Sequence, residues 1–168
     1  VEIGTLHGGS LSLVSNQQIS DSLFVGIDLF EYTNFGEKPR KKDPKGFAID
    51  ENIALKNIKK FNKNNHFKLI KGDSRNPETI SKLKNVLGNR EIDFLFIDGL
   101  HTKDGVLQDF INYRDLVAAG GFVVFDDYDD HLSVKSGVDE IVRKHADGFE
   151  VIGNFDNEFL LIKRGNVQ

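Results

Sequence analysis

The sequence contains no cysteine among its 168 residues. This absence excludes a disulfide framework, a catalytic thiolate and a cysteine-based zinc site. Long apolar runs are also missing: no segment approaches the roughly 20 residues that a membrane-spanning helix needs. No secretory signal pattern opens the chain either. We therefore expect no membrane partner and predict a cytoplasmic location.

Methionine and tryptophan are absent as well. Because the chain has no initiating methionine and opens directly on a strand-like segment, residues 1–4, we predict that further residues precede Val1 and cover the sheet. The net charge of −4 argues against a nucleic-acid partner. The length fits a single domain over residues 1–168. The oligomeric state, a homo-oligomer included, stays open.

Two apolar runs that end abruptly in acid are the most informative segments of the chain, residues 94–101 and 122–128. Short runs rich in Phe, Val and Ile are typical of strands buried on both faces of a parallel sheet. Ligands of open α/β sheets bind beyond the carboxyl ends of such strands. Asp98, Asp126 and Asp127 are therefore expected to face one crevice, where close carboxylates are tolerated if they are protonated, paired or bound to a cation.

The remaining pattern alternates strand and helix almost to the end of the chain. Two final strands are separated by only five residues, which is too short for a parallel crossover and predicts an antiparallel hairpin. The sequence thus predicts an α/β fold with a mostly parallel, seven-stranded sheet, helices on both faces and a C-terminal hairpin. Strands are expected at 1–4, 23–28, 66–71, 92–98, 122–126, 149–152 and 158–162, and helices at 9–18 (Leu11, Leu13 and Val14 inward), 48–62, from Pro77, 103–117 and 134–145.

A glycine-bearing turn joins the first strand to the first helix at residues 2–10. Glycines let a ligand approach the backbone, and a helix start offers free N–H groups. The spacing is not the G-x-G-x-x-G of dinucleotide binders, and Glu2, two residues before Gly4, suits a ligand that carries an ammonium group. The alternative is a tight turn with a solvated Glu2.

Two further acids close the second and third predicted strands. Asp28 lies about 20 residues beyond the first turn, where an acid can accept both hydroxyls of a ribose; the alternative is an ordinary helix-capping or loop residue. Asp73 and Ser74 follow the third strand and either line an adenine pocket or form a common Gly-Asp-Ser turn.

These motifs, in this order and spacing, resemble the class I S-adenosylmethionine (SAM)-dependent methyltransferases, and more narrowly the small-molecule branch with macrolide sugar O-methyltransferases and cephalosporin-hydroxylase-like proteins. The resemblance implies a Rossmann-like fold and a SAM-dependent O-methyltransferase acting on a small hydroxylated molecule, such as a sugar or natural product. It implies that Glu2 and Gly4 hold the amino-acid end of SAM, Asp28 its ribose, and Asp73 with Ser74 its adenine. Thr5, Ser10 and Asp98, from the same matching segments, complete the expected cofactor site.

The resemblance also implies a divalent cation, Mg²⁺, bound by Asp98, Asp126 and Asp127. All-oxygen ligands suit Mg²⁺, Mn²⁺ or Ca²⁺ better than zinc. A cation beside the acceptor hydroxyl lowers the pKa of that hydroxyl and directs it toward the methyl group. His101, three residues after Asp98, is the candidate base. Because Leu100 stands where some sugar methyltransferases carry a second acid, Lys103 and Asp104 stay open as bases, and His101 as a simple turn residue.

Two other function classes stay open. One is a nicotinamide- or nucleotide-sugar-binding Rossmann enzyme, against which the glycine spacing of the first turn and the lack of a Tyr-x-x-x-Lys pair argue. The other is a non-catalytic domain that keeps the cofactor pocket without the chemistry.

Overall fold

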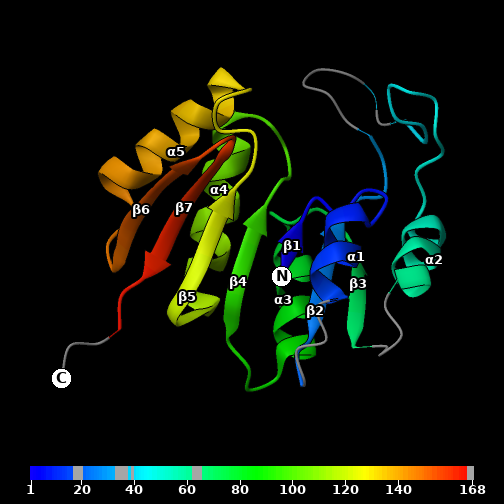
Figure 1. Ribbon diagram of the computed structural model, residues 1–168, viewed down its shortest axis with the longest axis horizontal. Coiled ribbons are helices and arrows are strands. Elements are labelled where there is room, and N and C mark those ends of the chain that lie inside the picture. Colours follow the sequence, from blue (N-terminus) through cyan, green and yellow to red (C-terminus); the bar gives the residue numbers. More distant parts are fainter. Residues whose placement is uncertain (17–20, 33–37, 39, 62–65, 166–168) are drawn as a thin grey trace. The chain divides into compact units, whose positions relative to one another are not determined.

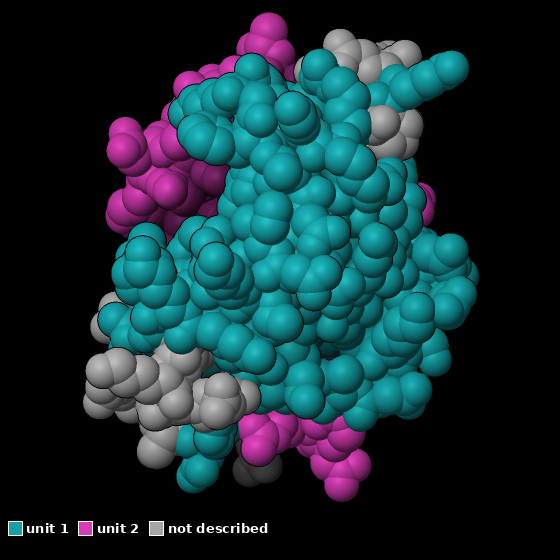
Figure 2. Space-filling view, turned by 90° about the vertical axis from the view of Figure 1, so that its right-hand side faces the viewer, with its two compact units in different colours: residues 1–86 teal, residues 87–168 magenta. Residues whose placement is uncertain are grey.

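The computed structural model describes residues 1–16, 21–32, 38, 40–61 and 66–165 (Figure 1). The chain divides into two compact units, Val1–Val86 and Leu87–Gln168, which are coloured separately in Figure 2. The single domain predicted over residues 1–168 stays a prediction. Within the described segments, no helix combines the length and the apolar character needed to cross a membrane.

The first unit contains three parallel strands in the order β3-β2-β1. Ile3 lies opposite Ile27, and Asp28 lies opposite Lys71, so the carboxyl ends of the three strands share one edge. Helices α1 and α2 lie on one face of these strands and α3 on the other (Figure 1). The elements are β1 (Glu2–Ile3), α1 (Gly9–Ser15), β2 (Phe24–Asp28), α2 (Glu51–Phe61), β3 (Phe67–Lys71) and α3 (Pro77–Leu87).

The core of the first unit forms where α1 and α2 meet the strands. Two clusters of buried side chains among the described residues are Leu11 with Ile58 and Phe67, and Phe30 with Ile49 and Ala54. The predicted inner side of α1 is correct for Leu11 and wrong for Leu13 and Val14, which are 72% and 43% exposed. Ser12 and Ser15 are buried instead, because a seven-residue helix presents only one narrow side to the core. Gln17 and Gln18, the predicted end of this helix, lie outside the described residues, as does Asn62 at the predicted end of α2.

The second unit contains four strands in the order β4-β5-β7-β6. β4 and β5 are parallel, whereas β7 runs antiparallel to both of its neighbours. The last two strands form the predicted hairpin, with a tight turn at Asp156 (φ 61°) and Asn157. The seven-stranded, mostly parallel sheet with a reversed C-terminal strand is thereby confirmed. The elements are β4 (Ile92–Ile97), α4 (Lys103–Tyr113), η1 (Arg114–Leu116), β5 (Val117–Phe125), α5 (Leu132–Lys144), β6 (Phe149–Phe155) and β7 (Glu158–Lys163).

The start of β5 differs from the prediction of a helix up to Val117 and a strand from Phe122. The helix ends at Tyr113, a 3₁₀ turn follows, and Val117 already pairs with Ile92. The next register pair joins Phe94 to Phe122, so the residues between Val117 and Phe122 bulge out of the ladder, with Gly120 at φ 80°. The glycine pair therefore marks an irregularity inside the strand and not its beginning.

The prediction that β4 and β5 are buried on both faces holds for one face and in part for the other, where Ile92 and Val124 are buried. Leu95 and Val123 are fully buried, and α4 contributes Phe110 to the same core against Phe125. Phe94 and Phe122, which lie opposite one another, remain 41% and 38% exposed. A continuous apolar run in the sequence thus overstated the burial of these strands.

Gly26 in β2 offers a direct test of the packing beneath the first turn. A Cβ at this position would lie 2.4 Å from Thr5 Oγ1 and 3.0 Å from Leu11 Cδ2. We expect Gly26→Ala to lower the free energy of unfolding by about 1–3 kcal/mol, since overpacking a dense core forces side chains off their preferred rotamers. Gly9→Ala is the matched control because a Cβ there meets nothing within 4 Å. Equal melting temperatures of the two variants would contradict this packing.

Candidate functional site

The predicted cofactor residues of the first turn come together around a buried acid. Glu2 is only 4% exposed, and the Ser10 hydroxyl donates a hydrogen bond to Glu2 Oε1. The alternative of a solvated Glu2 is therefore wrong. A carboxylate held away from water favours a cationic partner, which is the property expected for a site that binds an ammonium group.

Gly4 and Thr5 continue this turn at the end of β1. Gly4 has a φ of 94°, a conformation that favours glycine, and its N–H donates to the Ile27 carbonyl at 2.9 Å. Thr5 is buried, and its Oγ1 has no hydrogen-bond partner among the described residues. Buried hydroxyls are normally satisfied by protein, water or ligand, so Thr5 is a candidate contact for a bound molecule.

Asp28 ties the turn after β1 to the turn after β2. The Leu6 N–H donates to Asp28 Oδ2 at 2.8 Å, and the Phe30 N–H donates to Oδ1. Leu6 and Phe30 both have positive φ angles, 44° and 53°, so this carboxylate holds two strained backbone positions. A carboxylate offers about four acceptor sites, so one carboxylate can accept backbone N–H groups and ligand hydroxyls together.

Asp73 lies at the end of β3 and is bound by Arg75. The Arg75 side chain donates to Asp73 from Nε at 2.9 Å and from its terminal nitrogen at 2.7 Å, and the Arg75 N–H adds a third bond at 2.9 Å. These hydrogen bonds hold the pKa of Asp73 below its ordinary value. Asp73 stays charged at neutral pH and can accept a hydrogen bond, but it is unsuited to acid–base work. The roles of Asp73 and Ser74 at an adenine stay predictions.

The acids of the second unit follow two adjacent parallel strands. Asp98 comes directly after β4, and the Asp126 N–H after β5 donates to the Ile97 carbonyl at 3.1 Å. The Asp127 N–H in turn donates to Asp126 Oδ1 at 2.9 Å. The sequence prediction that β4 and β5 lie side by side, with their terminal acids at one edge, is confirmed.

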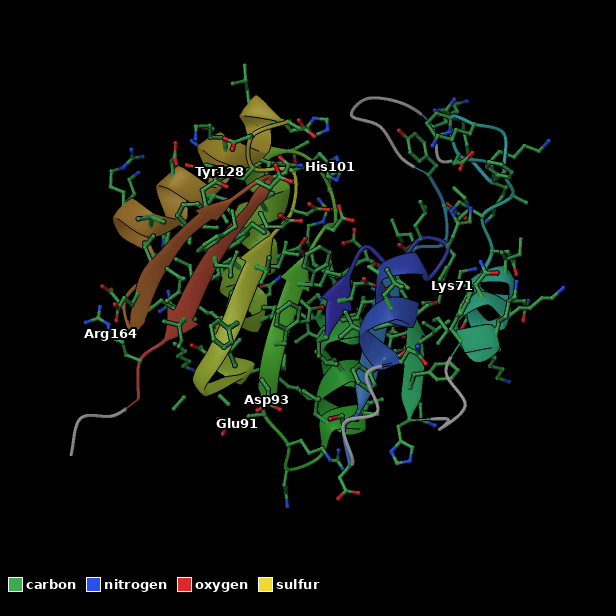
Figure 3. The ribbon with its side chains drawn as sticks, viewed as in Figure 1. Lys71, Glu91, Asp93, His101, Tyr128 and Arg164 are labelled. Carbon is green, nitrogen blue, oxygen red and sulfur yellow. The ribbon has the colours of Figure 1, made fainter. Side chains whose placement is uncertain are left out.

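His101, whose side chain is labelled in Figure 3, contacts two of these acids. Its Nε2 is 3.1 Å from Asp98 Oδ1 and 3.3 Å from Asp127 Oδ2. The imidazole of His131 approaches from the start of α5, with Nε2 at 3.7 Å from the same Asp127 Oδ2. One ligand atom each from His101, Asp127 and His131 lies within 4.8 Å of the others. We refer to these three residues as the His–Asp–His triad.

The electrostatics of this cluster reflect crowded negative charge. Burial raises the pKa of Asp98 in spite of the hydrogen bond from His101. Burial, and then the charge of Asp98, raise the pKa of Asp126 to about 6. The hydrogen bond to Asp98, and the charges of the neighbouring acids, raise the pKa of His101. The cluster therefore favours added positive charge, either as a proton on His101 or as a cation.

The sequence prediction missed two residues of this cluster, His131 and Asn157. The Asn157 amide nitrogen donates to Asp127 Oδ1 and to Asp130 Oδ2, each at 3.1 Å. Asn157 Oδ1 accepts the N–H groups of Asp129 and Asp130 at 3.0 and 3.1 Å. Asn157 thus fixes the loop that carries Asp127, whose φ of 60° is strained for a non-glycine residue. The spacing of His131, four residues after Asp127 at a helix start, was the only signal available in the sequence.

The geometry therefore groups the predicted site residues by unit. The first unit carries seven of them, in its strands, in the turns that follow these strands or at the start of α1: Glu2, Gly4, Thr5, Ser10, Asp28, Asp73 and Ser74. Asp98, His101, Asp126 and Asp127 follow the strand ends of the second unit. Asp98 as a cofactor contact stays a prediction. The oxygen donors of Asp98 and Asp127, both directed at one imidazole nitrogen, fit a divalent cation.

Two sequence comparisons match the chain. A family described as "Methyltransferase domain" matches residues 1–128. The uncharacterized protein R132 of Acanthamoeba polyphaga mimivirus is 38% identical over 171 residues, which cover 94% of this chain and 67% of that protein.

Solved structures show the same fold at low sequence identity. The structure of the O-methyltransferase NovP matches with a TM-score of 0.72 and 20% identity, over 98% of this chain and 71% of that chain. CalS11, a TDP-rhamnose 3′-O-methyltransferase of calicheamicin biosynthesis, matches with a TM-score of 0.67 and 16% identity over the same shares. An O-methyltransferase from Bacillus cereus in complex with SAH matches with a TM-score of 0.65 and 17% identity, over 97% of this chain and 72% of that chain.

Proposed function

Because the chain belongs to the methyltransferase-domain family of SAM-dependent enzymes, we propose that it transfers the methyl group of SAM to a hydroxyl group of a small molecule. The likeness to O-methyltransferases, one of which is described as acting on TDP-rhamnose, supports a hydroxylated acceptor such as a sugar or natural product. The observation that carries the proposal is the set of acids at the adjacent ends of β4 and β5, with His101 between Asp98 and Asp127.

The first unit supplies the groups proposed to bind SAM. Buried Glu2, held by Ser10, faces the ammonium group, while Gly4 and Thr5 contact the same amino-acid end. Asp28, held beside the first turn by the Leu6 N–H, would accept the ribose hydroxyls, and Asp73 with Ser74 would lie on the adenine side. We expect Asp28→Asn to weaken SAM binding about 10- to 100-fold, since hydrogen bonds to a charged acceptor contribute about 1.5–3 kcal/mol.

The second unit supplies the groups proposed to activate the acceptor. Asp98, Asp126 and Asp127 would hold a divalent cation, Mg²⁺ in the sequence prediction, which lowers the pKa of a neighbouring hydroxyl and orients it. The acceptor oxygen attacks the methyl carbon in line with the sulfonium sulfur, so one C–O bond forms and one C–S bond breaks. The hydroxyl proton passes to His101 or Asp98, and the sulfonium becomes a neutral thioether.

The proposal is tested first by calorimetric binding of SAM and then by release of S-adenosylhomocysteine (SAH) with a panel of hydroxylated acceptors. Asp98→Asn is expected to slow SAH release about 100-fold, the usual contribution of a positioned acid–base group, while SAM affinity stays within about threefold. Asp93→Asn is the matched control, because Asp93 is exposed near the opposite end of the same strand (Figure 3).

Three outcomes separate the parts of this proposal. No binding at millimolar SAM would overturn it altogether. Binding without SAH release on any acceptor of the panel would favour the non-catalytic domain. Full activity after treatment with EDTA would show that methyl transfer needs no cation, and the proposal would then keep only the general base.

A further inference from the structure

The two imidazoles beside Asp127 change the kind of cation that this site suits. We propose that the His–Asp–His triad, His101, Asp127 and His131, binds a first-row transition-metal ion such as Fe²⁺, Co²⁺ or Zn²⁺ in preference to Mg²⁺. The inference rests on the proposed function, because the ion would serve the same acceptor site. It departs from the all-oxygen set of Asp98, Asp126 and Asp127 that the sequence predicts.

The geometry brings the three donors to one place. His101 Nε2 and His131 Nε2 lie 3.3 and 3.7 Å from Asp127 Oδ2, and the two rings are 4.8 Å apart between centroids. Both imidazoles therefore present a ring nitrogen to the same carboxylate oxygen. Small side-chain shifts would place three donors around an ion at ordinary coordination distances of about 2.0–2.2 Å.

The backbone around the triad holds these donors in place. The Ser133 hydroxyl donates to the His101 carbonyl at 2.8 Å, which ties the segment before α4 to the first turn of α5. The His131 N–H donates to the Asp127 carbonyl at 3.0 Å. Asn157 holds the other carboxylate oxygen, Asp127 Oδ1, at 3.1 Å and leaves Oδ2 directed at the imidazoles. Such supporting hydrogen bonds are typical of metal ligands and raise affinity.

The donor types determine the selectivity. Mg²⁺ prefers oxygen ligands and gives up its water reluctantly, whereas imidazole suits the later first-row ions, with affinities that rise from Fe²⁺ through Co²⁺ and Ni²⁺ to Cu²⁺ and fall again at Zn²⁺. Two imidazoles and one carboxylate also leave coordination positions open for a substrate hydroxyl. Asp126 contributes less directly, because its Oδ1 already accepts the Asp127 N–H. The family match ends at residue 128, so His131 lies beyond the shared segment.

Metal binding would reassign the proton acceptor. The lone pair on His101 Nε2 cannot bind a metal ion and take a proton at the same time. Asp98, 3.1 Å from that nitrogen, then becomes the base for the acceptor hydroxyl. His101 acts as the base only in protein whose triad holds no metal.

The experiment uses untagged, chelator-treated protein without SAM or acceptor. Titration with Co²⁺ is expected to produce the visible absorption bands of nitrogen-coordinated cobalt, and Co²⁺ is expected to bind about 100-fold more tightly than Mg²⁺ in competition. His131→Gln is expected to abolish the bands and bring the two affinities within about tenfold. His66→Gln is the control, since His66 is exposed in the other unit. The His131 side chain is 49% exposed, so the variant should fold, which circular dichroism would check.

Two results would overturn the inference: Mg²⁺ binding as tightly as Co²⁺ to the unmodified protein, which needs no variant, or an unchanged cobalt spectrum in His131→Gln. Failure of the proposed function looks different. Cobalt binding without SAH release would leave the metal site standing and remove the methyl transfer. An unchanged cobalt spectrum in His131→Gln together with full SAH release would do the reverse.

Discussion

Replacing Asp127 by asparagine is expected to slow SAH release about 10²- to 10⁴-fold while leaving SAM affinity nearly unchanged. Asp127 belongs both to the all-oxygen set and to the His–Asp–His triad, so the proposed cation would lose its central anionic ligand under either assignment. Asparagine is the informative substitution because it tolerates the positive φ of 60° at this position. Its side-chain oxygen also keeps an acceptor for Asn157, and the loop should therefore keep its conformation.

The measurement compares turnover with SAM binding in the same preparation. Asp130→Asn is the matched control: Asp130 lies in the same loop, is exposed, and shares the Asn157 amide with Asp127. A parallel loss of SAM affinity would mean that the substitution had disturbed the fold. Unchanged turnover would remove Asp127 from the mechanism.

Asp126→Asn is expected to stabilise the chelator-treated protein at pH 8. The pKa of Asp126 is raised to about 6, mainly by burial and then by the charge of Asp98. A rise of about two pKa units corresponds to about 3 kcal/mol in full. Because the carboxyl group is only partly buried, solvent screening reduces the expected gain to about 1–2 kcal/mol. Asparagine keeps the acceptor for the Asp127 N–H and removes the unfavourable charge.

The sign of the pH dependence follows from this raised pKa. The folded protein binds the Asp126 proton more tightly than the unfolded chain does. Deprotonation of Asp126 therefore lowers the free energy of unfolding as the pH rises from about 4 through 6. The advantage of Asp126→Asn should be full above pH 6 and vanish below about pH 4. Thermal unfolding at pH 8 should show a rise in Tm of about 2–6 °C. A lower Tm for the variant at pH 8 would contradict the interpretation that burial of the charged Asp126 carboxylate destabilises the folded protein.

Glu140 provides a control of opposite sign within the same unit. Hydrogen bonds from Lys103 and Lys144 lower the pKa of Glu140 to about 2. Its stabilising contribution is therefore present above the ordinary pKa and is lost as the pH falls from about 4.5 toward 2. Glu140→Gln should lower Tm at pH 8 and have no effect near pH 2. The two variants together separate a destabilising carboxylate from a stabilising one.

The sequence predicted the elements and their pairing because the signals that define them are local. Apolar runs closed by an acid or a glycine marked the ends of β2, β3 and β4, and Pro77 marked the first residue of α3. The short link between β6 and β7 left only an antiparallel hairpin. The bulge at Gly120 could not be predicted, because two glycines indicate a loop and an irregular strand equally well.

The sequence predicted those residues of the candidate site that lie at or directly after the ends of strands. Asp28, Asp98 and Asp126 come directly at or after strands, so their position at the sheet edge could be inferred from the chain alone. Asn157 could not, because it meets Asp127 across 30 residues of sequence through the turn of the hairpin. The only sequence signal for His131 was its spacing from Asp127, and its approach to His101 depends on where α5 begins.

The dependence of Asp127 on Asn157 also bears on the order in which the protein becomes competent during translation. When the ribosome has delivered Asp98, His101 and Asp127, the side chain that sets the direction of the Asp127 carboxylate is still inside the exit tunnel. The loop becomes fixed only after β6 and β7 have emerged and closed against β5. The direction of the Asp127 carboxylate is therefore among the last features of the proposed site to be set as the chain is made.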